Sequence, residues 1–180
     1  MRITIIGNSG AGKSTVAVML GKEFQLPVYH LDKILWKSGW ERTQEEEFVA
    51  KHQEIIDKEQ WVLDGVAYKS TYERRFDRAE IIIYLDTSIE KCKVNAQKRM
   101  DEEKIRPNPY VNENCPYEGE IEENLKVIRL FHNEYRPLIL KQLEEHEKKT
   151  IILSDFDITS DKDLSDLVSR IKEKTNPNFN

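Results

Sequence analysis

Short segments rich in Ile, Val and Leu alternate along the chain with longer stretches of helical character. The apolar segments are Ile3–Ile6, Pro27–His30, Trp61–Asp64, Ile81–Leu85 and Thr150–Leu153. Their apolar residues do not alternate with polar ones, which is typical of strands that are buried on both faces. We therefore predict an α/β fold with a five-stranded parallel sheet that is covered by helices.

Helices are predicted between these strands and after the last one. The expected ranges are Lys13–Glu23, Thr43–Lys58, Ser88–Met100, Glu120–Glu145 and Lys162–Lys174. Two of the helices have a capping-box pattern at the start, in which a hydroxyl and a carboxylate bond to amides of the first turn. These patterns are Thr87–Glu90 and Ser160–Asp163.

Two intervals, Leu31–Arg42 and Asp101–Gly119, do not fit the alternation. Loops of that length in a compact domain are usually functional or mobile. A chain of 180 residues is long enough for one buried core but too short for two domains and a linker. We therefore predict a single domain over residues 1–180.

Charge and composition exclude several classes of protein. The formal net charge of −5 gives no general attraction to nucleic acid, so we expect no direct nucleic-acid binding. No apolar run approaches the roughly 20 residues that cross a bilayer, and the first apolar run is too short for a secretory signal. Cys92 and Cys115 lie far apart, which argues against a zinc site and against a disulfide framework. We expect a cytoplasmic protein with no membrane contact.

A phosphate-binding loop is predicted where the first strand meets the first helix. The pattern G-x-x-x-x-G-K-[ST] occurs there, in the strand-to-helix context that this motif requires. Its amide groups and the start of the following helix favour phosphate oxygens, so the partner is ATP or a similar nucleoside triphosphate. Lys13 would bridge the β- and γ-phosphates, Ser14 would bind Mg²⁺ and Thr15 would contact the α-phosphate. The predicted loop comprises Gly7, Asn8, Ser9, Gly10, Ala11, Gly12, Lys13, Ser14 and Thr15.

Two aspartates follow apolar strands and are candidates to hold the metal-bound water. These are Asp64, after Trp61–Leu63, and Asp86, after Ile81–Leu85. We favour Asp64, because Asp86 directly precedes a capping box and has a structural role available there.

The first interval offers residues for a second substrate. Asp32 lies just past the second strand, where open α/β sheets bind ligands, and can orient or deprotonate an acceptor hydroxyl; capping a turn is the alternative. Trp36 and Trp40 are four residues apart, so in a helix they would share a face and could stack on a planar substrate or pack in the core. We assign no chemistry to His30, and we expect His52 to be solvated.

Phosphoryl transfer also needs cations around the migrating group. Lys98 and Arg99 end the predicted third helix and Arg106 lies in the second interval, an arrangement that resembles a lid with its hinges. Ordinary solvated charges are the alternative. Arg75, with its neighbour Arg74, is a candidate to hold an anionic group of the acceptor near Asp64, again with solvent exposure as the alternative.

Taken together, these residues resemble the bacterial DNA topology modulation proteins, which belong among the adenylate-kinase-like P-loop kinases. The resemblance covers nearly the whole chain. It is based on the P-loop, Pro27–Lys33 with Trp36 and Gly39–Trp40, Trp61–Gly65, and Arg106–Pro107 followed by Cys115–Pro116.

The resemblance implies a three-layer P-loop NTPase fold like that of adenylate and shikimate kinases, with strand order 2-3-1-4-5. It also implies an acceptor-binding segment at about residues 31–58 and a lid at about residues 101–119. Asp64 and Gly65 match the Asp-Gly of nucleoside monophosphate kinases, but Val66 follows here where those kinases continue Phe-Pro-Arg. The arginine that grips an acceptor phosphate is therefore missing from its usual place, and the acceptor stays open.

The leading hypothesis is an ATP- and Mg²⁺-dependent phosphotransferase that acts on a small acceptor, either a nucleotide or a hydroxyl compound. Its predicted catalytic residues are Lys13, Arg99, Arg106 and Asp32; its acceptor residues are Asp32, Trp36, Asp64, Gly65 and Arg75; and its metal ligands are Ser14 and Asp64. The alternative is an ATP-binding regulatory module with no small-molecule acceptor. A GTPase is disfavoured because the guanine-reading Asn-Lys-x-Asp motif is absent. The family name suggests DNA as a partner, but the sequence has no basic helix to support it.

Overall fold

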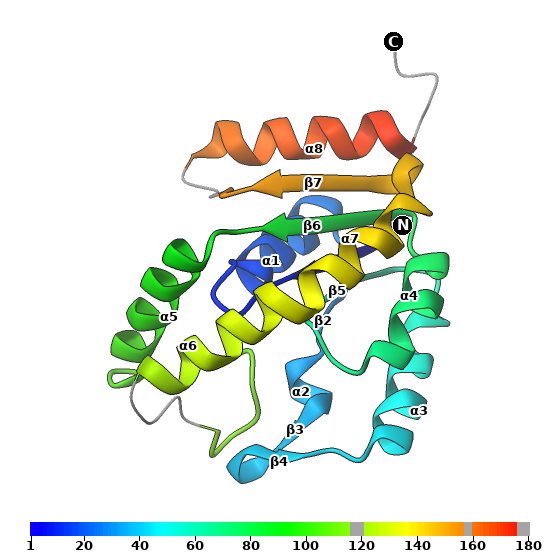
Figure 1. Cartoon of the computed structure of the whole chain (residues 1–180). Helices are drawn as coiled ribbons and strands as arrows, with labels where there is room; N and C mark the ends of the chain where they lie inside the picture. The colour runs from blue at the N-terminus through cyan, green and yellow to red at the C-terminus, as the bar shows by residue number, and fades with distance from the viewer. Residues whose placement is uncertain (116–120, 157–159, 176–180) are drawn as a thin grey trace.

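The computed structural model describes residues 1–115, 121–156 and 160–175. Its main sheet is built from β1 (Arg2–Gly7), β2 (Val28–His30), β5 (Trp61–Asp64), β6 (Ile81–Asp86) and β7 (Thr150–Ser154). All neighbouring strands are parallel and the order is β2-β5-β1-β6-β7. When these five strands are numbered along the chain, the order is 2-3-1-4-5, as predicted (Figure 1).

Helices cover both faces of this sheet, which makes a three-layer fold. Within β6, Ile81 and Ile83 pack into one hydrophobic cluster while Ile82 and Tyr84 pack into the other. The first cluster is closed by α1 (Lys13–Phe24) and α8 (Asp161–Thr175). The second is closed by α3 (Glu45–Ile56), α4 (Tyr72–Arg78) and α7 (Arg136–Glu144). Uniformly apolar strands are therefore explained by burial on both sides.

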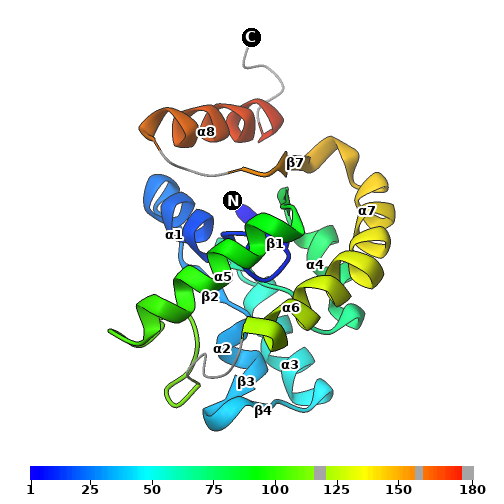
Figure 2. The ribbon, with the colours of Figure 1, turned by 60° about the vertical axis from the view of Figure 1, so that its left-hand side comes forward.

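Two further helices pack against each other at one end of the sheet. They are α5 (Ile89–Glu103) and α6 (Ile121–Leu130), and Figures 1 and 2 show them side by side. The predicted start at Glu120 lies outside the described residues. The long helix that we expected after it is interrupted by a π-helical turn, Phe131–Tyr135, before α7 begins. Pro137, which has no amide hydrogen to donate, is the second residue of α7, just after that wider turn.

Several short elements were not predicted, because they are too short to show a hydrophobic period. The first interval folds as α2 (Asp32–Leu35) and then as a hairpin of β3 (Trp36–Lys37) and β4 (Glu41–Arg42). Figures 1 and 2 place this hairpin at the end of the molecule that is opposite α8. The helical spacing that we assumed for Trp36 and Trp40 is therefore wrong.

One capping box is confirmed and the other is displaced. At α8 the amide of Ser160 donates to Asp163 Oδ2 at 2.9 Å, and the amide of Asp163 donates to Ser160 Oγ at 3.3 Å. At α5 the cap is Ser88 instead of Thr87, and its Oγ accepts from the amide of Lys91. Asp155, from the loop after β7, accepts from the amide of Ser88 and so takes the place of the predicted Glu90.

The prediction for His52 is wrong. This side chain lies on the inward face of α3 with an exposed fraction of 2%, and its ring stacks on Phe48. Burial, helped by the positive charges of Arg75 and Arg74, lowers the pKa of His52 to about 3.

Among the described residues, no helix has the length and apolar character needed to cross a bilayer.

Candidate active site

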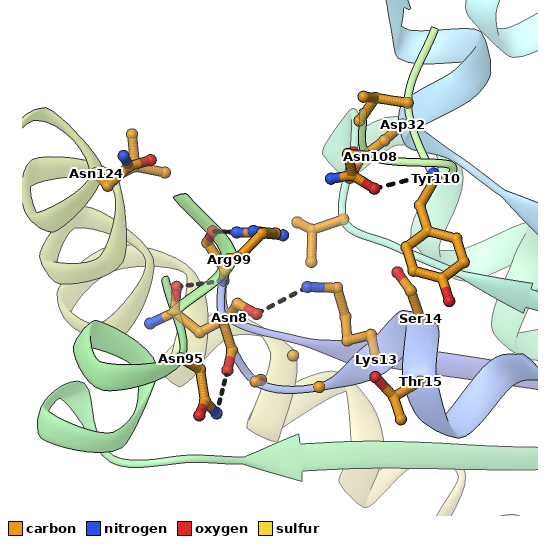
Figure 3. Close-up of a pocket in the computed structure, with 18 of the residues that line it drawn as sticks. Asn8, Lys13, Ser14, Thr15, Asp32, Asn95, Arg99, Asn108, Tyr110 and Asn124 are labelled. Carbon is orange, nitrogen blue, oxygen red and sulfur yellow. Dashed lines mark hydrogen bonds between the residues drawn. The ribbon is translucent and has the colours of Figure 1, made fainter. Parts of the chain in front are cut away.

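The predicted P-loop forms a tight turn between β1 and α1, and α5 and α6 hold it in place (Figure 3). Gly10 has φ +76°, and a Cβ there would lie 2.3 Å from the carbonyl oxygen of Cys92 on α5. Asn95 of α5 donates to the carbonyl of Gly10 at 2.8 Å, and Asn8 donates to the carbonyl of Ile128 on α6 at 2.9 Å. Only glycine fits at position 10. The two hydrogen bonds hold the loop backbone against α5 and α6 without a ligand.

Lys13 lies across the mouth of this loop. Its Nζ donates to the carbonyl oxygen of Asn8 at 2.7 Å (Figure 3). Burial lowers the pKa of Lys13, while the nearby carboxylates of Asp32 and Asp64 oppose this shift. A phosphate between Lys13 and the loop amides would replace the Asn8 carbonyl as the partner of the ammonium group.

The carboxylate of Asp64 meets the hydroxyl of Ser14. Ser14 Oγ donates to Asp64 Oδ2 at 2.7 Å, and His30 Nδ1 lies 2.6 Å from Asp64 Oδ1. Asp86, the alternative, is instead held in a two-bond ion pair by Arg136, with both N–O distances 2.7 Å. The geometry therefore favours Asp64 over Asp86 beside the P-loop.

The oxygen pair of Ser14 and Asp64 fits Mg²⁺. This cation prefers oxygen ligands and is usually held by one or two protein groups together with phosphate oxygens and waters. The described residues contain no cluster of three or more His, Cys, Asp or Glu that would hold a metal by itself. The donor set is thus suited to an ion that arrives with a triphosphate.

Asp32 begins α2 and lines the same cavity as the P-loop. The cavity has a volume of about 960 Å³, within the size range of small-molecule sites. In the described part of the chain no group forms a hydrogen bond or ion pair with the carboxylate of Asp32, and burial raises its pKa against the opposing charge of Lys13. Figure 3 shows Asp32 and Tyr110 together on one side of the space above the P-loop. This carboxylate is available to a ligand of the cavity.

Cations line the cavity on several sides. Arg99 NH2 lies 3.3 Å from Ser9 Oγ in the P-loop, and Lys98 and Arg106 are also lining residues. Of the described residues, five cationic side chains line the cavity: Lys13, Arg42, Lys98, Arg99 and Arg106. The acidic lining residues are Asp32, Glu102 and Glu103. The cavity is therefore suited to anionic ligands.

The predicted lid and the predicted acceptor segment are fastened to each other. Asn112 Nδ2 donates to the carbonyls of Lys33, at 2.9 Å, and Trp36, at 2.5 Å. The amide of Gly39 donates to the carbonyl of Asn114 at 2.8 Å, and Cys115 Sγ lies 3.1 Å from the carbonyl of Lys37. The wall segment, residues 106–111, thus lines one side of the cavity, and the bonds of Asn112, Asn114 and Cys115 attach it to the β3–β4 hairpin. Residues 116–119 of the predicted lid lie outside the described residues.

The structure does not bring every predicted residue to the cavity. Arg75, predicted to hold an anionic group, is fully buried; it donates to the carbonyl of Gly65 at 3.1 Å and lies over Tyr72. Burial lowers the pKa of Arg75 to about 10. Gly65 itself is needed for its backbone, because φ is +122° and a Cβ would lie 2.9 Å from Leu31 Cβ. Arg75 therefore supports the turn after β5 and does not line the cavity.

Two residues near the site were not predicted from the sequence. His30, to which we assigned no chemistry, contacts Asp64, and Arg42 lines the cavity from β4. The separation of His30 and Asp64 along the chain hid their contact, because it arises from the pairing of β2 with β5. For Arg42 a signal was available: Gly39 near the middle of Trp36–Arg42 is typical of a hairpin turn.

Known kinases resemble this chain in sequence or in fold. An adenylate kinase from Buchnera aphidicola subsp. Baizongia pistaciae is 28% identical over 192 residues, which cover 92% of this chain and 87% of the relative. A solved shikimate kinase from Acinetobacter baumannii, in complex with shikimate, has a TM-score of 0.54 and 19% identity, with 95% of this chain and 90% of that chain covered. A shikimate kinase from Bacteroides thetaiotaomicron has the same TM-score of 0.54 and 15% identity, with 96% and 97% covered.

At these identities the likeness to the shikimate kinases shows the fold, and the fold is that of a P-loop kinase. The match of a family model is more direct, since it extends from β1 through the P-loop and α5 to the start of α6. Because the AAA domain model matches residues 3–123, the chain belongs to the AAA domain family.

Proposed function

We propose that this protein is an ATP- and Mg²⁺-dependent phosphotransferase that acts on a small-molecule acceptor. The observation that carries the proposal is the unpaired carboxylate of Asp32, which lines one cavity with the P-loop. Asp64 already fills the position beside Ser14 that suits a metal ligand, so the carboxylate of Asp32 is free to serve an acceptor. The adenylate kinase relative supports the same class of reaction.

In the proposed reaction the triphosphate of ATP lies in the loop of residues 7–15, and Lys13 moves from the Asn8 carbonyl to the β- and γ-phosphates. Ser14 and Asp64 would hold Mg²⁺, which would neutralise phosphate charge. Arg99, and Arg106 from the wall segment, would face the transferring group. These roles use the cations that already line the cavity.

The chemical step is an in-line displacement. Asp32 accepts the proton of the acceptor hydroxyl, the acceptor oxygen forms a bond to the γ-phosphorus, and the bond from that phosphorus to the β–γ bridging oxygen breaks. The products are the phosphorylated acceptor and ADP. The raised pKa of Asp32 makes it a better base than an ordinary solvated aspartate.

An acceptor screen tests the proposal. ATP consumption is measured with nucleotides, sugars and small hydroxy acids, and at least one class should stimulate turnover. Asp32→Asn should then lower acceptor-dependent turnover by about 10²- to 10⁴-fold, while ATP binding measured by calorimetry is retained. Asp166→Asn, at an exposed position on α8, is the matched control and should change neither quantity.

ATP binding without stimulation by any acceptor would count against the proposal and would favour the regulatory module instead. The link to DNA topology and a cytoplasmic location stay predictions.

A further inference from the structure

Arg42 is the cation that the β3–β4 hairpin contributes to the cavity. It pairs with Trp36 across the hairpin, and residues directly opposite each other in an antiparallel pair project to the same face. Both side chains are lining residues of the cavity, together with Trp40. The hairpin therefore presents an arginine next to an aromatic surface.

The carboxylate of Glu47 is engaged by two lysines, one of which lies on the other face of the hairpin. Lys37, which pairs with Glu41, donates to Glu47 Oε2 at 2.8 Å, and Lys51 donates to the other oxygen of Glu47. For Arg42 the described residues include no carboxylate within ion-pair distance. Its guanidinium instead lies over the Tyr68 ring, 4.4 Å from the centroid, and the Tyr68 hydroxyl is fixed by a 2.6 Å bond to the carbonyl of Thr43.

Arg42 is thus oriented by an aromatic ring and has its charge available. A guanidinium presents forked donors that match carboxylate and phosphate oxygens. The remaining cations of the cavity belong to the P-loop, to α5 and to the segment after α5. Arg42 comes from a different element and has no triphosphate group assigned to it by the proposed function.

Asp32 and Arg42 line one cavity and can act on one small molecule. Asp32 begins α2, Trp36 directly follows the last residue of that helix, and Arg42 pairs with Trp36 across the hairpin. A small-molecule acceptor in this cavity of about 960 Å³ can therefore contact both Asp32 and Arg42.

We propose that Arg42 is the anchor for an anionic group of the acceptor, and that the acceptor is a small hydroxyl compound with a carboxylate or phosphate at the end away from Asp32. This inference rests on the proposed function for the role of Asp32. A hydroxyl is preferred to a phosphate as the accepting group, because an anion beside the unpaired Asp32 would meet its negative charge. The aromatic surface of Trp36 supports the body of the acceptor.

A binding experiment tests the anion site without any turnover. The indole N–H signals of Trp36, Trp40 and Trp61 are followed by NMR during titration with benzoate, with phenyl phosphate and with neutral benzamide. We expect benzoate or phenyl phosphate to shift the Trp36 signal saturably, with benzamide at least tenfold weaker, since a bond to a charged group is lost. The two anions distinguish a carboxylate site from a phosphate site, and Trp61, which is buried in the core, is the internal reference.

The variants Arg42→Met and Arg42→Lys make the test specific. Arg42→Met should abolish the response to the anions, and Arg42→Lys should restore part of it. Arg74→Met is the matched control, because Arg74 is exposed and donates to Gln53 on α3. Thermal unfolding of each variant checks that the fold is retained. A response to benzamide as strong as that to the anions, or an unchanged response in Arg42→Met, would overturn the proposal.

Kinetics separate this inference from the proposed function. With an active hydroxy acid and its neutral amide as paired acceptors, Arg42→Met should raise KM for the acid about ten- to hundredfold, leave kcat within about threefold, and not affect the amide. An effect on kcat alone would contradict an anchoring role. If no acceptor is turned over but the Arg42-dependent anion response is present, the proposed function fails while the anion site stands.

Discussion

His30 Nδ1 lies 2.6 Å from Asp64 Oδ1, while the other oxygen of the same carboxylate accepts from Ser14 at 2.7 Å. Both oxygens of Asp64 are therefore positioned, one by β2 and one by the first turn of α1. Tyr110, from the wall segment, packs against the His30 ring with centroids 4.8 Å apart. A side chain without an assigned role in the sequence is thus a direct support of the carboxylate at the proposed metal site.

Replacing His30 should weaken the response to Mg²⁺. In His30→Leu the carboxylate of Asp64 loses one of its two fixed contacts, and loss of a bond to a ligating group typically costs about 10- to 100-fold in metal affinity. The measurement is the Mg²⁺ concentration that half-saturates ATP turnover. His30→Asn, which can still donate from a similar position, should recover part of the loss. An unchanged Mg²⁺ requirement in His30→Leu would show that this contact is only structural.

Replacing Lys13 should weaken triphosphate binding. Lys13→Met takes away the only cation inside the loop of residues 7–15, and a charge-assisted contact in a buried site is worth about 1.5–3 kcal/mol, which corresponds to about a 10- to 150-fold loss of ATP affinity. Calorimetry with ATP provides the measurement. Lys22→Met, at an exposed position near the end of the same helix, should bind ATP as the unmodified protein does. Equal affinities for both variants would refute the role of Lys13.

The protein should lose stability in mild acid through His52. Above the ordinary histidine pKa of 6.5, the ring is neutral in both the folded and the unfolded chain. Below pH 6.5 the His52 ring binds a proton in the unfolded chain, whereas in the folded protein the ring stays neutral until the pH approaches about 3. The free energy of unfolding should therefore fall between pH 6.5 and pH 3, by up to about 1.4 kcal/mol per pH unit from this group.

Denaturant unfolding of the protein and of His52→Leu between pH 8 and pH 4 measures this effect. At pH 8 the difference between the two gives the packing change of the substitution alone. As the pH falls, the variant should lose less stability than the unmodified protein. Parallel pH profiles would mean that His52 is not the group responsible.

Lys149 should stabilise the end of α4. Its Nζ donates to the carbonyls of Phe76, Asp77 and Ala79, at 2.6, 3.1 and 3.0 Å, which are groups that the helix leaves without partners. Lys149→Met should therefore lower the free energy of unfolding by about 1–3 kcal/mol. The exposed neighbour provides the control, since Lys148→Met should change it by less than about 0.5 kcal/mol. Chemical denaturation of both variants compares them; a loss as large in Lys148→Met would contradict the capping role.

The sequence by itself determined the sheet and the phosphate loop. The inner strands are largely apolar because both of their faces are covered, as consecutive residues such as Ile81–Leu85 show, whereas the edge strand β7 alternates between buried and exposed residues. The P-loop is likewise a local motif that can be recognised from consecutive residues. Position 10 is glycine because its backbone lies against α5, where a side chain would not fit. Local rules of this kind operate over a few neighbouring residues, so one chain is enough to recognise them.

Only the tertiary structure decided which distant side chains meet. The choice between Asp64 and Asp86 depends on which carboxylate lies beside Ser14, and pairing of β1 with β5 places Asp64 there while Arg136 engages Asp86. The sequence also left open whether Arg75 is buried, and it gave no prediction for the charge of Arg42 in the cavity, because both depend on packing between elements. Such contacts depend on strand order and on packing between elements, so they cannot be predicted from a residue's neighbours along the chain.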